Sequence, residues 1–177
     1  PLNGGAILSS FGSGGHTRWR WENTPDRPLE TGWGMGLTAQ HLVWVDPDVA
    51  PQEPPWTTRF LPDAGNAVFR SDWSEDARWL LLVAEQGSAR MTLHDHVDGT
   101  SFSMAAYGEY LLLDPGYYKP VEINNARTSS PRAHNVVLID GKGAPDKGLL
   151  TDFGDTDALL VNTVDGDRVD YAEAHQS

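Results

Sequence analysis

Two histidines and an aspartate stand at alternate positions in the stretch from Thr92 to Gly116. The segment reads TLHDHVDGTSFSMAAYGEYLLLDPG and contains His94, His96 and Asp98. Residues two apart in an extended strand point to the same face, so these three side chains lie together if the strand reaches Asp98. Imidazole nitrogen and carboxylate oxygen are ligands of zinc, which keeps an open position when it is catalytic. The pattern therefore predicts part of a metal centre.

Further ligands for such a centre must come from elsewhere in the chain. Asp114 ends an apolar run, where a lone carboxylate is costly unless it is paired or bound, although it is equally an ordinary turn residue before Pro-Gly. His134 stands just before another apolar run, in the segment RAHNVVLIDG. Because neighbouring strands lie about 4.8 Å apart, side chains from two or three strands can converge on one ion.

The segments that must position these residues have the pattern of an antiparallel β protein. After Phe60, short apolar runs are separated by Gly, Asp, Asn and Pro turn signals; the runs are NAVFRSDW, ARWLLLVAEQ, SFSMAAYG, EYLLLDPG, NVVLIDG, DALLVNTV and RVDYAEA. Such spacing is typical of a β-sandwich. The run YLLLD is apolar almost throughout, which predicts a central strand. Trp73 and Trp79 are expected in the core rather than stacked on sugar rings.

The beginning of the chain has a different character. Residues 1–32 are rich in Gly, Ser and Pro, which predicts loop with little regular structure. Trp33–Val45 is the best helix candidate because Trp33, Leu37 and Trp44 share one stripe at helical spacing. Val49–Trp56 contains three prolines and reads as a stiff linker. We therefore expect one unit over residues 1–55 and a β-sandwich over residues 56–177, the latter cut short at its C-terminal end.

Composition excludes several kinds of partner. The net charge is −12, which argues against nucleic acid and against anionic membrane surfaces, since both require a basic field. No apolar run approaches the roughly 18 residues of a membrane helix. There is no cysteine, so disulfides and thiolate metal sites are impossible. The chain lacks an initial methionine and reads as a piece of a longer protein, so a missing leader is not informative.

The motifs, taken in order, resemble the β-sandwich domain of the heparinase II/III-like family of polysaccharide lyases. The segments FLPDAGNAVFRSDW, HDHVDGTSFSMAAYGEYLLLDPGYY and SSPRAHNVVLIDG follow one another as in that family, over roughly Phe60 to Gly141. The resemblance implies an all-β fold, an antiparallel β-sandwich of the supersandwich type. It also implies that residues 1–55 are the end of an α-helical toroid domain.

The resemblance further implies a zinc ion and assigns its ligands. The second histidine of H-x-H, the aspartate of D-P-G and the histidine of H-N are His96, Asp114 and His134 in this chain. His94 is then the catalytic histidine, which faces the cleft and handles the carboxylate of the substrate. Asp98 is implied to orient an imidazole by accepting its N–H.

Other residues between and after these motifs are assigned to supporting roles. Asn135 is implied to make a hydrogen bond similar to that of Asp98. The segment that joins the D-P-G and H-N motifs carries three cations against Glu122 alone, and such a patch on an acidic chain favours an anionic ligand. These substrate-binding candidates, which are equally ordinary loop charges, are Lys119, Arg127 and Arg132.

The implied reaction is β-elimination at a uronic acid of a glycosaminoglycan or of alginate. The residues that transfer protons are expected in the missing N-terminal toroid, so this chain alone is expected to show little or no turnover. The substrate class implies a periplasmic or secreted protein. One alternative is a non-catalytic carbohydrate-binding or structural sandwich. A cupin-type metal enzyme is less favoured, because no glutamate follows His96 at short spacing and a P-x-G element is lacking.

Overall fold

The protein is described by a computed structural model over residues 14–23, 48–85, 96–116, 128, 130–144 and 158–176. The chain divides into two compact units, Pro1–Pro55 and Trp56–Ser177. The second unit contains the strands and the candidate site described below. No helix in the described part of the chain is both long enough and apolar enough to cross a membrane.

The first unit contains a helix where the sequence predicts loop. Helix α2 spans Gly14–Glu22, so the loop prediction is wrong there. Its glycines occupy only the first turn, and Arg18 pairs with Glu22 one turn later at 2.5 Å, a spacing that supports a helix. The backbone N–H of Gln52 also donates to the first turn, at 2.8 Å from a carbonyl oxygen. The helix predicted over Trp33–Val45 lies outside the described residues.

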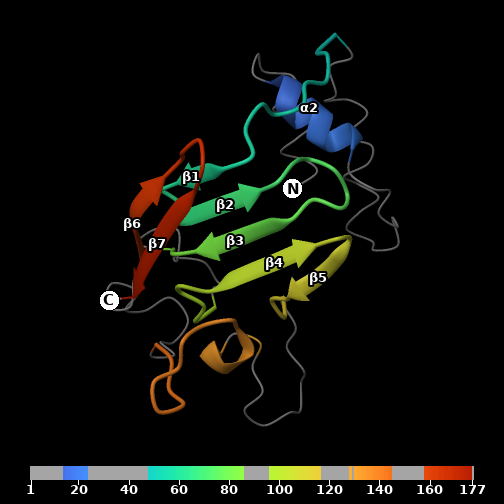
Figure 1. Ribbon diagram of the computed structural model, residues 1–177. Helices are drawn as coiled ribbons and strands as arrows, with labels where there is room; N and C mark the ends of the chain where they lie inside the picture. The colour runs from blue at the N-terminus through green and yellow to red at the C-terminus, as the bar shows by residue number, and fades with distance from the viewer. Residues whose placement is uncertain are drawn as a thin grey trace. The chain divides into compact units, whose positions relative to one another are not determined.

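The second unit is built from antiparallel sheets, as expected (Figure 1). Five strands form one sheet in the order β1-β2-β3-β4-β5, and two more form a hairpin. The strands are β1 Arg59–Leu61, β2 Asn66–Arg70, β3 Trp79–Val83, β4 Phe102–Ala106, β5 Glu109–Leu112, β6 Ala158–Val164 and β7 Tyr171–Gln176. The predicted antiparallel all-β class is therefore confirmed.

One face of the five-stranded sheet is apolar throughout. Residues directly opposite in an antiparallel pair share a face, and the register places these residues in two rows: Phe60, Ala67, Leu82 and Phe102, and then Phe69, Leu80, Met104 and Leu112. The hairpin is tied to the same unit at two points. The Ala158 N–H donates to the Glu85 carbonyl at 3.2 Å, and the buried Thr58 hydroxyl donates to the Asp170 carboxylate.

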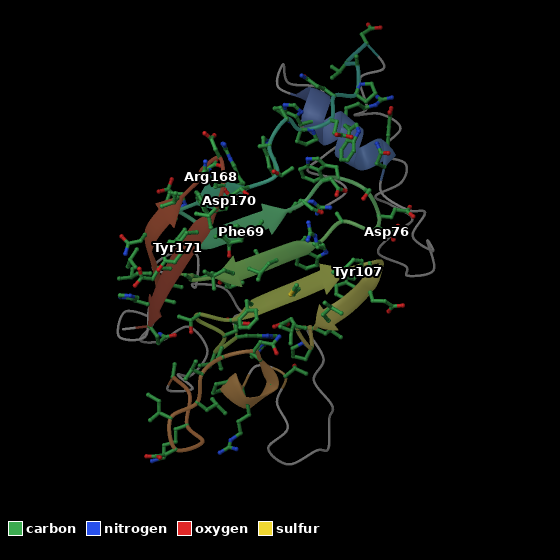
Figure 2. The ribbon with its side chains drawn as sticks, in the orientation of Figure 1. Phe69, Asp76, Tyr107, Arg168, Asp170 and Tyr171 are labelled. Carbon is green, nitrogen blue, oxygen red and sulfur yellow. The ribbon has the colours of Figure 1, made fainter. Side chains whose placement is uncertain are left out.

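Among the described strands, β5 lies at the edge of the sheet, contrary to the prediction that YLLLD is a central strand. A two-residue turn with positive φ, at Tyr107 (57°) and Gly108 (75°), folds β5 directly back on β4. The strands therefore follow one another in sequence order, and the last of them is left with one neighbour. Figure 2 shows Tyr107 beside Asp76, and the Tyr107 N–H donates to the Asp76 carbonyl at 3.3 Å.

The run NVVLIDG does not form a strand, contrary to the prediction. It follows a short 3-10 helix, Pro131–Ala133, and it makes only one isolated bridge, between Ile139 and Lys142. Asp140 (φ 52°) and the glycine after it (φ 73°) turn the chain back immediately. Within the described residues, the segment therefore pairs only with its own continuation.

Candidate metal centre

Three side chains with metal-binding atoms converge at one end of the five-stranded sheet. The ligand atoms of His96, Asp98 and His134 all lie within 4.8 Å of one another. The rings of the two histidines are 5.1 Å apart between centroids and are inclined by 47°. Ligands at zinc bond lengths are roughly 3.4 Å apart in a tetrahedral site, so small side-chain rotations bring this group to binding distance.

His96 and Asp98 come from a turn that precedes β4, and not from a strand as the H-x-H pattern predicted. The turn is pinned to the end of β3, because the Thr100 N–H donates to the Val83 carbonyl at 2.8 Å and the Ser101 carbonyl accepts the Val83 N–H at 2.8 Å. The intervening residue, Val97, is buried. Burial therefore alternates along the turn as the sequence predicted: Val97 is buried, and His96 and Asp98 are half-buried.

His134 is the most enclosed member of the group. Its side chain has no solvent exposure, and its Nδ1 lies 2.6 Å from Oδ2 of Asp114. In a neutral imidazole, this contact with a carboxylate acceptor requires the proton on Nδ1 and leaves a lone pair on Nε2. That Nε2 atom is buried and has no hydrogen-bond partner among the residues that the structure describes. Because unpaired buried polar atoms are costly, this donor set is one that a metal ion fits.

Asp114 has two roles in the structure. One oxygen accepts the Gly116 N–H at 3.0 Å, which is the ordinary turn contact of an aspartate before Pro-Gly. The other oxygen holds His134. The turn contact thus orients the carboxylate, and the carboxylate orients the imidazole. The turn role of Asp114 is therefore observed, and its role as a metal ligand stays a prediction.

Comparison with known proteins adds the family. The heparinase II/III-like C-terminal domain matches residues 53–166, which is well over half of the chain. The chain belongs to the heparinase II/III-like family. The resemblance inferred from the motifs is therefore confirmed. A comparison with curated proteins gives no match.

Solved structures share the fold of this heparinase II/III-like domain. A heparinase III with methylated lysines is 17% identical, with a TM-score of 0.54 over 90% of this chain and 22% of that chain. The heparan sulfate lyase HepC from Pedobacter heparinus is 19% identical, with a TM-score of 0.54 over 80% of this chain and 22% of that chain. The chain thus spans about a fifth of the length of these proteins, and the likeness shows the fold.

Among the residues predicted to support the site, Asn135 is one that the structure describes. The Asn135 amide does not meet an imidazole in the described contacts; it donates to the Phe102 carbonyl at 2.9 Å and to the Leu113 carbonyl at 3.4 Å. It therefore ties the start of β4 to the end of β5 beside His134. Three predicted site residues lie outside the described part of the chain: His94, Lys119 and Arg127.

Arg132 is exposed but anchored. Its Nη2 donates to the Gly141 carbonyl at 2.6 Å, which fastens the Asp140–Gly141 turn to the 3-10 helix. An open cleft of about 570 Å³ is lined in part by Thr100, which is two residues from Asp98 in the sequence. The residues that line it are Leu82, Thr100, Val137, Ala172, Ala174, His175 and Gln176. The heparinase II/III-like domain thus has a cleft next to the turn that carries part of the candidate metal centre.

A second polar cluster, on the hairpin, was missed in the sequence. Glu173 accepts hydrogen bonds from Asn162 (2.6 Å), His175 (2.5 Å) and Tyr171 (3.2 Å). These contacts, led by that of Asn162, lower the pKa of the Glu173 carboxyl, and the same carboxylate raises the pKa of Tyr171. The spacing Y-x-E-x-H on one strand face is the signal that predicts it. Because the cluster is exposed, it contributes little to stability.

Replacing Asn135 with alanine is expected to lower the free energy of unfolding by about 1–3 kcal/mol, because two backbone carbonyls lose their donor. Urea unfolding of the variant measures this change. Asn162→Ala, which removes an exposed amide from the hairpin, is the matched control and should change stability by less than about 0.5 kcal/mol. Equal effects of the two substitutions contradict a structural role for Asn135.

Proposed function

We propose that this heparinase II/III-like domain is the metal-binding and substrate-binding part of a lyase that cleaves uronic-acid-containing polysaccharides by β-elimination. The observation that carries the proposal is the environment of His134. It is a fully buried imidazole with one nitrogen on a carboxylate and the other unpaired. It belongs to a family domain whose fold is also that of a heparan sulfate lyase.

The proposed metal ligands are His96, Asp114 and His134, and the proposed ion is zinc. In this arrangement Asp98 orients His96, and the short contact between Asp114 and His134 opens to admit the ion. The Nε2 atom of His134 is also compatible with a second arrangement, in which Asp98 is the ligand and Asp114 orients His134 through Nδ1. When bound in either arrangement, the ion supplies positive charge beside the cleft.

In β-elimination a base removes the proton on C5 of the uronate, the C4–O bond breaks, and an acid protonates the leaving glycosidic oxygen. The intermediate has enolate character, so its carboxylate must be neutralised. We assign this task to His94 together with the cations Lys119, Arg127 and Arg132. The anchored Arg132 guanidinium keeps its charge at the surface, close in sequence to His134.

The proton-transfer residues are assigned to an N-terminal α-helical toroid of the parent protein. The substrates proposed are polysaccharides of the glycosaminoglycan or alginate type, which places the parent in the periplasm or outside the cell. The solved structures whose fold this chain shares are several times longer than it is. This difference in length is compatible with a further domain in the parent.

Incubation of the isolated chain with heparin, heparan sulfate and alginate is expected to give no unsaturated uronate, as measured by ultraviolet absorbance. The parent protein is expected to form it, and the His96→Ala parent is expected to lose that activity. The Arg168→Gln parent, which changes an exposed residue of the hairpin that does not line the cleft, is the control and should keep it. Robust turnover by the isolated chain contradicts the assignment of the proton-transfer residues to another domain.

A further inference from the structure

The face of the five-stranded sheet opposite the apolar rows carries a row of basic and aromatic residues. In the register, Arg70 is opposite Trp79, Trp79 is opposite Ala105, and Ala105 is opposite Tyr110. Residues opposite one another share a face, so this row crosses four strands. The alanine in the row leaves room between the two aromatic side chains that flank it.

The two aromatic residues meet over that alanine. The rings of Trp79 and Tyr110 are 6.1 Å apart between centroids and perpendicular to one another, at 89°. Trp79 is half-buried, whereas Tyr110 is 66% exposed. The pair thus presents ring surface to solvent at the edge strand, although Trp79 was expected in the core.

A second aromatic pair continues the row beyond Arg70. The Arg70 guanidinium carbon lies 4.5 Å from the centre of the Trp73 ring, and Trp73 packs against Trp56 at 5.1 Å and 75°. The Trp73 indole N–H donates to the Trp56 carbonyl at 3.0 Å, which fixes the pair. Arg59, which is exposed, lies 6.0 Å from the Trp56 ring centre.

The loop after β2 holds this arrangement in place. The carboxylate of Asp72 accepts hydrogen bonds from the Ser74 hydroxyl, the Ser74 N–H (2.8 Å) and the Ser71 hydroxyl (2.8 Å). These contacts, those of Ser74 first, lower the pKa of the Asp72 carboxyl. The Asp72 carbonyl also accepts the Nε–H of Arg70 at 3.0 Å. The acid next to the row is therefore engaged within its own loop, and the Arg70 side chain is fixed against Trp73.

We propose that these residues form a second saccharide-binding surface, which takes an acidic polysaccharide chain. We call it the arginine–aromatic array, and its members are Trp56, Arg59, Arg70, Trp73, Trp79 and Tyr110. Sugar rings lie against the aromatic rings, as apolar ring faces favour, and carboxylate or sulfate groups meet the two arginines, whose planar guanidinium matches them. The array places two arginine side chains, 4.5 Å and 6.0 Å from aromatic ring centres, on a chain of net charge −12.

The array is separate from the candidate metal centre. It lies where β3 begins and β4 ends, at the end marked by Asp76 and Tyr107 in Figure 2. The metal-centre residues gather at the other end of the same strands, next to Val83 and Phe102. The choice of an acidic saccharide as the ligand of the array rests on the proposed function, in which the site at the metal centre binds the same class of polysaccharide. The geometry of the array does not depend on the metal.

Binding of a short heparan sulfate fragment to the 177-residue chain tests the proposal, measured by calorimetry in the presence of a chelator. Arg59→Gln and Tyr110→Ala are each expected to weaken binding by about tenfold, which is the effect of losing one charge-assisted or stacking contact. Matched controls are Arg168→Gln on the hairpin and Tyr107→Asn at the turn, both at exposed sites. The affinities of these controls should lie within about twofold of the affinity of the unsubstituted 177-residue chain.

The proposal is overturned if the unsubstituted 177-residue chain does not bind, if the array and control variants lose equal affinity, or if a single-stranded oligonucleotide binds equally well. Circular dichroism of each variant confirms that the exposed substitutions leave the fold intact. Binding that disappears in chelator belongs to the metal centre and also overturns the array. Binding that persists in chelator, with no lyase activity in the parent protein, contradicts the proposed function and leaves the array supported.

Discussion

Replacing His134 with alanine is expected to abolish the proposed zinc binding and to lower the free energy of unfolding by about 2–4 kcal/mol. The side chain is fully buried, so its removal leaves a cavity. It also removes the imidazole that Asp114 holds at 2.6 Å, and a half-exposed carboxylate loses its partner. Zinc titration measures the first effect. Urea unfolding in chelator measures the second, because chelation removes the stabilisation that bound metal itself contributes.

His175→Ala is the control for that substitution. His175 also contacts a carboxylate, with its Nε2 2.5 Å from Glu173, but its side chain is 59% exposed. Exposed pairs contribute about 0–1 kcal/mol, so its loss should change stability by less than about 1 kcal/mol and leave zinc binding unchanged. If the two substitutions have the same effect on either measurement, the buried His134 side chain does not have the proposed role in stability and zinc binding.

The two carboxylates near His134 are expected to differ in their effect on zinc affinity. Asp114→Asn should lower the affinity by more than about 100-fold, because it removes a ligand in the proposed arrangement. Asp98→Asn should lower it by about tenfold, the effect of losing a group that orients a ligand. The substitution with asparagine keeps the size of each side chain and an oxygen that accepts a hydrogen bond. Competition with a zinc-binding dye measures both affinities.

A larger loss of zinc affinity in Asp98→Asn than in Asp114→Asn would support the second arrangement of ligands. If Asp98→Asn causes the larger loss, the ion sits on Nε2 of His134 with Asp98 as the ligand, and Asp114 only orients the ring. Asp170→Asn is the matched control, because its carboxylate accepts hydrogen bonds from the Thr58 hydroxyl and the Gly166 N–H and contacts no histidine among the described residues. A comparable loss of affinity in Asp170→Asn contradicts both arrangements.

The sequence predicts the strands better than their order. Periodicity and turn signals locate β2 to β7, because these are local properties of the chain. Strand order depends on pairing between distant segments, so the apolar run at β5 was placed at the centre when its tight turn leaves it at the edge. The same limit applies to NVVLIDG, whose apolar residues predict a strand but whose Asp140–Gly141 turn closes it on itself.

The candidate site was predicted from motifs and not from periodicity. The pairing of Asp114 with His134 joins residues 20 positions apart, and no local rule brings them together. The ordered family motifs did so. Asn135 was assigned to an imidazole because sequence names a hydrogen-bonding side chain but not its partner, and the structure gives that partner as the strand backbone.

Helix α2 and the position of Trp79 on the sheet face opposite the apolar rows were not predicted from the sequence. The glycines at the start of α2 indicate loop, yet they cost little in a first turn, and the Arg18–Glu22 pair supports the rest. Trp73 and Trp79 were assigned to the core by their size. The register places Trp79 on the face opposite the apolar rows, and Arg70 covers Trp73.

Diffraction at the zinc absorption edge, from crystals of the zinc-loaded chain, is the most direct test of the central claim. The account predicts one anomalous peak per chain, bonded at about 2.0–2.1 Å to a nitrogen of His96 and a nitrogen of His134. A peak confined to the exposed His175–Glu173 pair, or no peak at any zinc concentration, contradicts it.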